Sequence, residues 1–188
     1  MIDPQKISLR DLTESDLSLL LDYWFRSPIV FFEKLGVDWS KMPPEAEMKK
    51  TLLEKLRENE NRKKSKLPVL VITYDGQAIG AHTINPLIEN DHGIFHAHIW
   101  RPEFRRRGIA LHTYPQALKI FMERFNLERI LFKTPIQNQG AIRVKEKLGI
   151  RYLGEETINF SIIKDGTRAQ VFEVTRAEII HCPAGSKD

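Results

Sequence analysis

The chain has 188 residues, of which 41% are hydrophobic and 29% are charged, and its formal net charge is +4. This composition fits one globular domain with a substantial core, and no apolar run approaches the roughly 18 residues that would make a membrane-spanning chain. Residues 1–4 show neither the basic region nor the apolar core of a signal sequence, and the single cysteine, Cys182, excludes an intrachain disulfide, so we predict a cytoplasmic protein without membrane contact.

The first third of the chain predicts one strand and two helices. Residues 7–10 have the pattern of a short strand, and residues 13–16 offer an N-cap and an acidic first turn for a helix. An unusually aromatic stretch follows Pro28. The prolines at positions 43 and 44 then open a second helix, because apolar residues recur after them at a four-residue spacing: Met48, Leu52 and Leu56.

The remaining sequence predicts a mixed sheet. Two β-rich runs, residues 68–74 and 78–84, are joined by an Asp-Gly turn and predict a hairpin. Further strands are expected at residues 94–100, 129–133, 152–163 and 169–175, and further helices over the stretch that reaches Phe125 and over residues 141–148. Because a strand, helix, strand unit implies a parallel pair, we predict an α/β (α+β) fold with a mixed central sheet of six or seven strands. No linker appears, so residues 1–183 are predicted to form one domain and residues 184–188 a flexible tail.

A basic turn at residues 105–110, Arg-Arg-Arg-Gly-Ile-Ala, lies between the predicted strand at 94–100 and the helix that reaches Phe125. Unpaired backbone N–H groups at a helix start point toward an anion, the helix dipole favours negative charge, and Gly108 lets the backbone approach without a Cβ. Arginine guanidinium groups add bidentate partners for phosphate oxygens. The turn is therefore a candidate pyrophosphate site, and the alternative is an exposed turn without function.

Two motifs together carry a family resemblance. The pattern Arg-x-x-Gly-x-Ala is preceded by Pro102-Glu103-Phe104 and followed by Asn138-x-x-Ala141-Ile142 and by Glu146-Lys147-Leu148-Gly149. In this order, and each at a predicted strand-to-helix junction, the motifs resemble the GNAT superfamily of N-acetyltransferases. The closest resemblance is to its ribosomal-protein N-terminal acetyltransferase-like branch. It covers residues 93–154 and extends loosely over most of the chain.

The resemblance implies a GNAT fold with a splayed central pair of parallel strands, and acetyl-CoA as co-substrate without a metal. It places the backbone of Trp100 at the acetyl carbonyl and Asn138 at the cofactor, where this residue also suits an N-cap. The turn residues that it assigns to cofactor binding are Arg105, Arg106, Arg107, Gly108, Ile109 and Ala110.

Amine acetylation needs a base, because a protonated amine must lose a proton before it attacks a thioester. His96 and His98 lie two residues apart on a predicted strand, so both side chains fall on the same face as Trp100, and an ordinary imidazole titrates near pH ~6.5. We predict that either histidine relays the amine proton, directly or through water. The alternative is that one or both pack under a helix, and a metal site is weaker still because no third ligand has suitable spacing.

The sequence departs from the superfamily at two positions. Many members have a tyrosine seven residues after the asparagine, where this chain has Lys145, so the usual acid for the departing thiolate is missing. Tyr114 and Tyr152 are its candidate substitutes. Pro115 falls where the cofactor helix should run and cannot donate to the carbonyl four residues earlier, so the helix is expected to kink there or to restart at Pro115.

The predicted function is acetyl transfer from acetyl-CoA to a primary amine, a peptide N-terminus or a small amine, by direct attack in a ternary complex. A homodimer is compatible with it, and Glu33 and Asp38 are candidates for attracting a cationic acceptor. One alternative is a non-catalytic acyl-CoA-binding sensor, favoured by Lys145 and Pro115. Another is a basic nucleic-acid or ribosome-associated module, which is disfavoured because the basic residues do not interleave with aromatic ones.

Overall fold

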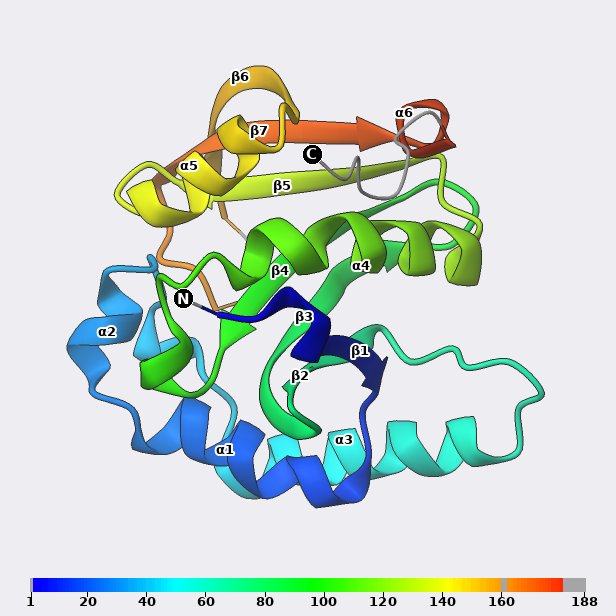
Figure 1. The fold of residues 1–188 in the computed structure, drawn as a ribbon. Coiled ribbons are helices and arrows are strands. Elements are labelled where there is room, and N and C mark those ends of the chain that lie inside the picture. The colour runs from blue at the N-terminus through cyan, green and yellow to red at the C-terminus, as the bar shows by residue number, and fades with distance from the viewer. Residues whose placement is uncertain (1, 160–161, 181–188) are drawn as a thin grey trace.

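The computed structural model describes residues 2–159 and 162–180, and these contain one sheet of seven strands with helices packed against it (Figure 1). The strands are β1 (Ile7–Asp11), β2 (Val69–Tyr74), β3 (Gln77–Ile88), β4 (His92–Ile99), β5 (Arg129–Pro135), β6 (Arg151–Ile158) and β7 (Thr167–Thr175). The α-helices of the described residues are α1 (Leu17–Arg26), α2 (Ile29–Glu33), α3 (Glu45–Glu60), α4 (Ile109–Phe125), α5 (Gln139–Lys147) and α6 (Arg176–Ile180).

The sheet is mixed, and its parallel pair lies near its middle. The strand order is β1-β2-β3-β4-β5-β7-β6, and β4 with β5 is the parallel pair among otherwise antiparallel neighbours. These two strands pair only from His92 opposite Arg129 to Ile94 opposite Leu131. Both strands continue beyond that point, so their carboxyl ends splay apart. The predicted mixed sheet with a splayed central parallel pair is confirmed.

Alternation along the strands builds a core layer on each face of the sheet. In β2, Leu70 packs in the layer under α4, whereas its neighbour Val71 packs in the layer under α1, because successive strand side chains point to opposite faces. Side chains of α4 and α5 complete the first layer, and side chains of α1, α2 and α3 complete the second. Figure 1 shows α4 across one side of the sheet and α1 beside α3 on the other.

Helix α4 runs without interruption across Pro115. It begins at Ile109, directly after the basic turn, so the expected restart at Pro115 does not occur. Its buried stripe faces the first core layer and consists of Tyr114, Ala117, Leu118, Phe121, Met122 and Phe125. Burial of this amphipathic face outweighs the one intrahelical hydrogen bond that the proline removes.

Most elements follow the sequence predictions, but β3 runs on to Ile88, beyond its predicted end at residue 84, and the short helix α6 was not predicted. The aromatic stretch after Pro28 forms the short helix α2, which its sequence pattern does not predict. Strand β6 ends at Ile158, before the predicted boundary at residue 163. Gly149 follows α5 with φ +65°, as predicted for a left-handed cap.

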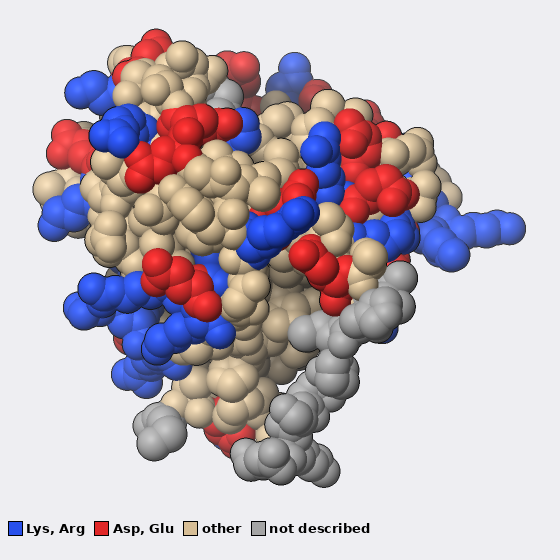
Figure 2. Space-filling model, turned by 90° about the horizontal axis from the view of Figure 1, so that it is seen from above, with Lys and Arg blue, Asp and Glu red and all other residues tan. Residues whose placement is uncertain are grey.

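Charged side chains of both signs cover the surface. On the face seen from above, Lys and Arg are interspersed with Asp and Glu apart from one gathering of basic side chains at its lower left (Figure 2). A basic stripe of the kind that tracks a nucleic-acid backbone does not cross this face. Within residues 2–159 and 162–180, no helix is long and apolar enough to cross a membrane. Cys182 and the predicted tail at residues 184–188 lie outside the described residues.

Candidate active site

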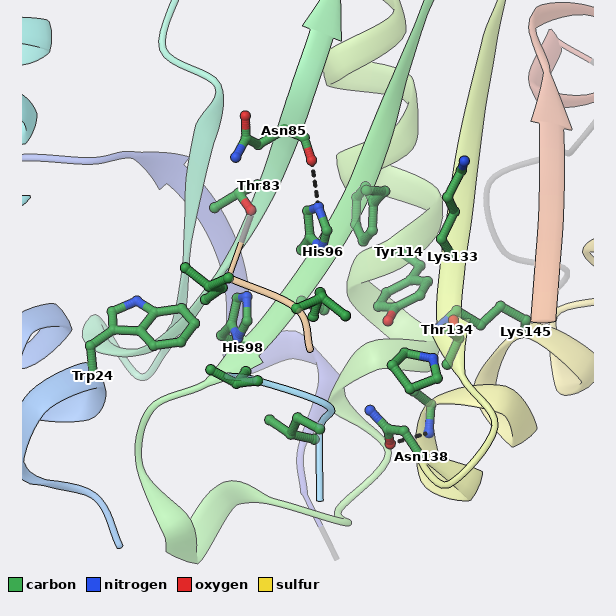
Figure 3. A pocket seen from close by; sticks show the side chains of 18 residues that line it. Trp24, Thr83, Asn85, His96, His98, Tyr114, Lys133, Thr134, Asn138 and Lys145 are labelled. Atoms are coloured by element: carbon green, nitrogen blue, oxygen red, sulfur yellow. Dashed lines mark hydrogen bonds between the residues drawn. The ribbon is translucent and has the colours of Figure 1, made fainter. Parts of the chain in front are cut away.

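A pocket of about 220 Å³ lies where β4 and β5 separate. Because the two strands no longer pair beyond Ile94, the pocket passes between them, from Tyr114 on α4 to Trp24 on α1. Apolar side chains form much of its wall. Its uncharged polar groups come from several elements and include Thr83, Asn85, His96, His98, Thr134 and Asn138 (Figure 3).

The two predicted catalytic histidines both line this pocket from β4 (Figure 3). His96 Nε2 donates to the backbone oxygen of Asn85 at 2.6 Å. A carbonyl can only accept, so in the neutral ring Nε2 carries the proton and Nδ1 carries the lone pair. His98 Nδ1 lies 3.0 Å from the hydroxyl of Tyr23, and either atom of that pair can donate. His96 is therefore the histidine whose tautomer the structure defines.

Burial keeps both imidazoles neutral. It lowers the pKa of His98 to about 3. It also lowers the pKa of His96, against the opposing hydrogen bond to Asn85, and the positive charge of Lys145 acts in the same direction as burial. A neutral imidazole can accept a proton at physiological pH. The role of base is thus chemically open to His96 through Nδ1.

Trp100 does not line the pocket but is buried in the core layer under α1. Its N–H donates to the backbone oxygen of Ile79 on β3 at 2.9 Å. Hydrogen-bonding groups alternate sides along a strand, so the N–H groups of Ile99 and Ala97 point away from β3, toward the gap. The N–H of Trp100 is therefore already engaged, and the N–H groups of Ile99 and Ala97 are the alternative candidates for the predicted acetyl contact.

The turn before α4 has the backbone geometry of an anion site. Gly108 is the N-cap of α4 with φ +81°, and Arg106 is also left-handed with φ +60°. Ile109 and Ala110 open the helix, where N–H groups have no intrahelical acceptor. A Cβ at Gly108 would meet no protein atom within 4 Å. The backbone conformation, and not crowding within the protein, is what requires glycine here.

The three arginines of the turn are not equivalent. Arg105 Nε donates to the backbone oxygen of Ile99 at 3.0 Å, and its guanidinium lies 4.1 Å from the centre of the Phe31 ring. These contacts hold the side chain of Arg105 against the end of β4. Arg106 and Arg107 are exposed, and their side chains form no hydrogen bond or ion pair with the part of the chain that the structure describes. The guanidinium of Arg105 is thus already engaged within the protein, and the phosphate role of all three arginines stays a prediction.

Asn138 has the position of both roles predicted for it. Its Oδ1 accepts from the N–H of Ala141 at 3.2 Å, which caps α5. The same residue lines the pocket (Figure 3). The cap is confirmed, and the cofactor contact stays a prediction.

Lys145 is the pocket residue whose setting the sequence prediction missed. Its side chain is buried and lines the pocket beside Tyr114. The available signal was spacing, because Lys145 follows the buried Ile142 by one helical turn. Of the two tyrosines named as substitute acids, Tyr114 lines the pocket, whereas Tyr152 is exposed on β6.

The residues expected to attract a cationic acceptor lie elsewhere. Neither Glu33 nor Asp38 lines the pocket, and the Asp38 carboxylate accepts hydrogen bonds from Ser40. Among the aromatic residues of this region, Trp24 lines the pocket and Phe32 is fully buried in the core. The two carboxylates are close in sequence to the aromatic residues of this region, but they do not line the pocket of the folded protein.

Comparison with known proteins decides the family. The sequence matches the model of the acetyltransferase (GNAT) domain over residues 6–151, which is more than half of the chain. This chain belongs to the GNAT acetyltransferases. It is accordingly an acetyl-CoA-dependent acetyltransferase. No curated protein sequence matches the chain.

Solved GNAT structures share this fold at low sequence identity. Spermidine N-acetyltransferase from Vibrio cholerae, in complex with CoA and spermine, has a TM-score of 0.70 and 17% identity, covering 94% of this chain and 99% of that chain. The microcin C7 self-immunity acetyltransferase MccE, in complex with acetyl-CoA and AMP, has a TM-score of 0.69 and 13% identity, with coverages of 90% and 92%. A GNAT-family acetyltransferase from Bacillus anthracis has a TM-score of 0.68 and 14% identity, with coverages of 94% and 99%.

The described residues fit an acyl-CoA. The N–H groups at the start of α4, together with Arg106 and Arg107, suit the pyrophosphate, and the pocket in the splay suits the thioester end. The sensor alternative loses one of its two supports because α4 is continuous across Pro115. No three His, Cys, Asp or Glu side chains of residues 2–159 and 162–180 are grouped to hold a metal ion, and a metal-free reaction stays a prediction.

Proposed function

We propose that this GNAT enzyme acetylates the α-amino group of a peptide or amino-acid derivative, by direct attack on acetyl-CoA in a ternary complex. One observation carries the proposal: the described lining of the pocket contains two histidines and two lysines but no carboxylate. Such a lining repels a cation and accepts an amine that is readily deprotonated.

The basicity of the acceptor decides between amine classes. An α-amino group has a pKa near ~7.8, whereas a lysine-type alkylamine has a pKa near ~10.4, so deprotonating the latter at neutral pH costs about 3.5 kcal/mol more. Without a carboxylate to bind the ammonium form, the pocket has no compensating attraction for the more basic amine. An α-amino group is therefore the better acceptor.

The chain's own residues handle the amine proton. His96 is neutral, and Asn85 holds its ring through Nε2, so Nδ1 takes the proton that the amine loses. The backbone of Ile99 and Ala97 orients the acyl group at the gap. When bound, acetyl-CoA supplies an activated thioester carbonyl. His98 supports the pocket wall through its contact with Tyr23.

A peptide N-terminus is also the acceptor class of the ribosomal-protein branch that the sequence resembles. The Vibrio cholerae neighbour is a spermidine N-acetyltransferase, and a polycation of that kind calls for acidic groups at the acceptor site. A homodimer and a cytoplasmic location stay predictions.

Thiol release from acetyl-CoA tests the acceptor class. The panel pairs a peptide with a free N-terminus against the same peptide with a blocked N-terminus and one lysine, and adds spermidine. We expect release with the free N-terminus and at least about tenfold less with the other two amines, because a 1.4 kcal/mol difference already gives that ratio. Preferred acetylation of spermidine would contradict the proposal.

A further inference from the structure

Lys145 is a buried amine in the wall of the acyl pocket. Its relative exposure is 4%, and Figure 3 shows its side chain reaching toward Tyr114 and Thr134. Its Nζ lies 5.9 Å from the centre of the Tyr114 ring and 5.5 Å from that of Phe132. The amine is therefore placed against aromatic rings inside the protein, within the space where the acyl group is expected.

The titratable groups that face Lys145 from neighbouring elements provide no counterion. They are His96 from β4, Tyr114 from α4 and Lys133 from β5. Glu156 on β6 lies 2.6 Å from the Nζ of Lys133 and is paired with it. Lys145 itself has no ion pair with any residue of 2–159 or 162–180.

The other charged residues of α5 do not reach the pocket. Arg143, Glu146 and Lys147 are exposed on the outer side of the helix. Burial is accordingly the cause that lowers the pKa of Lys145, to about 7. At physiological pH the amine thus exchanges between its charged and neutral forms.

Lys145 is poorly explained by packing alone. Contact of an ammonium with aromatic rings recovers only part of the cost of removing it from water. A methionine of similar length would fill the same space without that cost. An unpaired ionisable group in a ligand pocket is better explained by chemistry that needs its proton.

We propose that Lys145 is the general acid of acetyl transfer and donates its Nζ proton to the sulfur of CoA. This inference rests on the proposed function of the pocket. A C–N bond forms between the amine and the acetyl carbon while the C–S bond breaks, and the electron pair of the broken bond goes to sulfur. Lys145 supplies the proton that completes the thiol, and His96 Nδ1 receives the proton from the amine. Solvent then reprotonates Lys145 and deprotonates His96, so both residues return to their starting states.

The two proton-transfer groups influence each other across the pocket. The positive charge of Lys145 lowers the pKa of His96, which shows that they interact electrostatically. Between the lowered pKa of His96 and the pKa of Lys145 near 7, the imidazole on β4 is neutral while the amine on α5 still carries its proton. A base and an acid in their required forms at one pH is the arrangement that two-proton chemistry needs.

The test compares Lys145→Met and Lys145→Tyr with Lys147→Met, an exposed control on the same helix. Ultraviolet absorbance of the thiolate gives the pKa of the thiol of bound CoA, independently of turnover. Because the amine carries its charge only up to about pH 7, the two groups titrate as a coupled pair, and the apparent pKa of the thiol should be lower in the wild type than in Lys145→Met. Equal thiol pKa values in these two proteins would overturn the proposal.

Turnover supplies the second measurement. Lys145→Met should lower kcat about 100-fold while CoA affinity is retained, and Lys147→Met should change neither. Lys145→Tyr should recover part of kcat and move the alkaline limb of the pH profile from near 7 toward ~10. An unchanged kcat in Lys145→Met, or an acetyl group found on Lys145 by mass spectrometry after incubation with acetyl-CoA, would contradict the role of acid. If no amine is acetylated by the wild type, the proposed function fails, while the thiol titration still tests Lys145.

Discussion

The basic turn and the acyl pocket belong to one site but are built in different ways. The turn at residues 105–110 is largely exposed, and its shape depends on a left-handed backbone at Gly108. The pocket is enclosed by side chains from α1, β4, β5, α4 and α5. Binding an anion needs only local backbone geometry, whereas shifting the pKa of His96 and Lys145 needs burial that distant segments provide together.

The largest effect is expected when a histidine of β4 that lines the pocket is replaced. His96→Ala should lower kcat/KM by about 10²–10³-fold, because the amine loses its proton acceptor, and should leave the affinity for CoA unchanged. His92→Ala is the matched control, since His92 lies on the same strand but pairs with Asp91 outside the pocket. Steady-state rates and calorimetric CoA titration measure both quantities. Equal losses in His96→Ala and His92→Ala, or unaltered pH–rate profiles in both His96→Ala and His98→Ala, would show that neither histidine acts as the base.

The stability of Lys145→Met tests whether the amine of Lys145 is buried in the folded protein. The pKa of Lys145 is near 7 in the folded protein and near 10.5 in the unfolded chain. Between these values the unfolded chain binds a proton that the folded protein does not, so wild-type stability should rise with pH through this window. The variant lacks this dependence and should exceed the wild type by about 2–5 kcal/mol at pH 7, with the gap shrinking toward pH 10. Denaturant unfolding measures it, and a gap that does not change with pH would show that the amine is not buried as described.

Gly108→Val tests whether the backbone of the turn binds phosphate, and a control variant accounts for the strain of a valine at positive φ. Gly76 has φ +78° and, like Gly108, open space around its missing Cβ, so Gly76→Val is a matched control. Both variants should lose about 1–2 kcal/mol of stability because a β-branched residue is strained at positive φ. Only Gly108→Val should also weaken CoA binding, by about tenfold or more, as measured by calorimetry. Equal CoA affinity in both variants would mean that the turn binds no phosphate.

The smallest effects should distinguish the arginines. Arg106→Ala and Arg107→Ala should each reduce CoA affinity by about 0.5–1 kcal/mol, and less at high salt, because their charges are exposed. Arg105→Ala should instead lower stability by about 1–3 kcal/mol, since it leaves the carbonyl of Ile99 without its donor. Binding at two salt concentrations and thermal unfolding separate these outcomes. A stability loss in Arg107→Ala as large as that in Arg105→Ala would reject the division of roles.

Local sequence patterns were sufficient for much of the fold and for the turn. Strand alternation, the Asp-Gly hairpin and the apolar stripe of α4 each follow from neighbouring residues, as does the cap at Gly149. The pair of histidines on β4 was also found from spacing, because residues two apart on a strand share a face. The basic turn was recognised for the same local reason.

The features that the sequence did not show are contacts between distant segments. The sequence shows three arginines in a row, but only the fold shows that Arg105 contacts Ile99 and Phe31. Glu33 and Asp38 follow the aromatic stretch in sequence without facing the pocket. Burial of Lys145 depends on how α5 packs against α4 and β5, which spacing on one helix could suggest but not establish.

The pH dependence of acetyl transfer to a peptide with a free N-terminus tests the central claim most directly. Under saturating acetyl-CoA and peptide, wild-type kcat should persist below pH 6.5, because the pKa of His96 is lowered, and should fall above about pH 7 as Lys145 loses its proton. A rate that rises steadily from pH 6 to pH 9 with the peptide, unchanged in Lys145→Met, would contradict an acid and a base built by burial in this pocket.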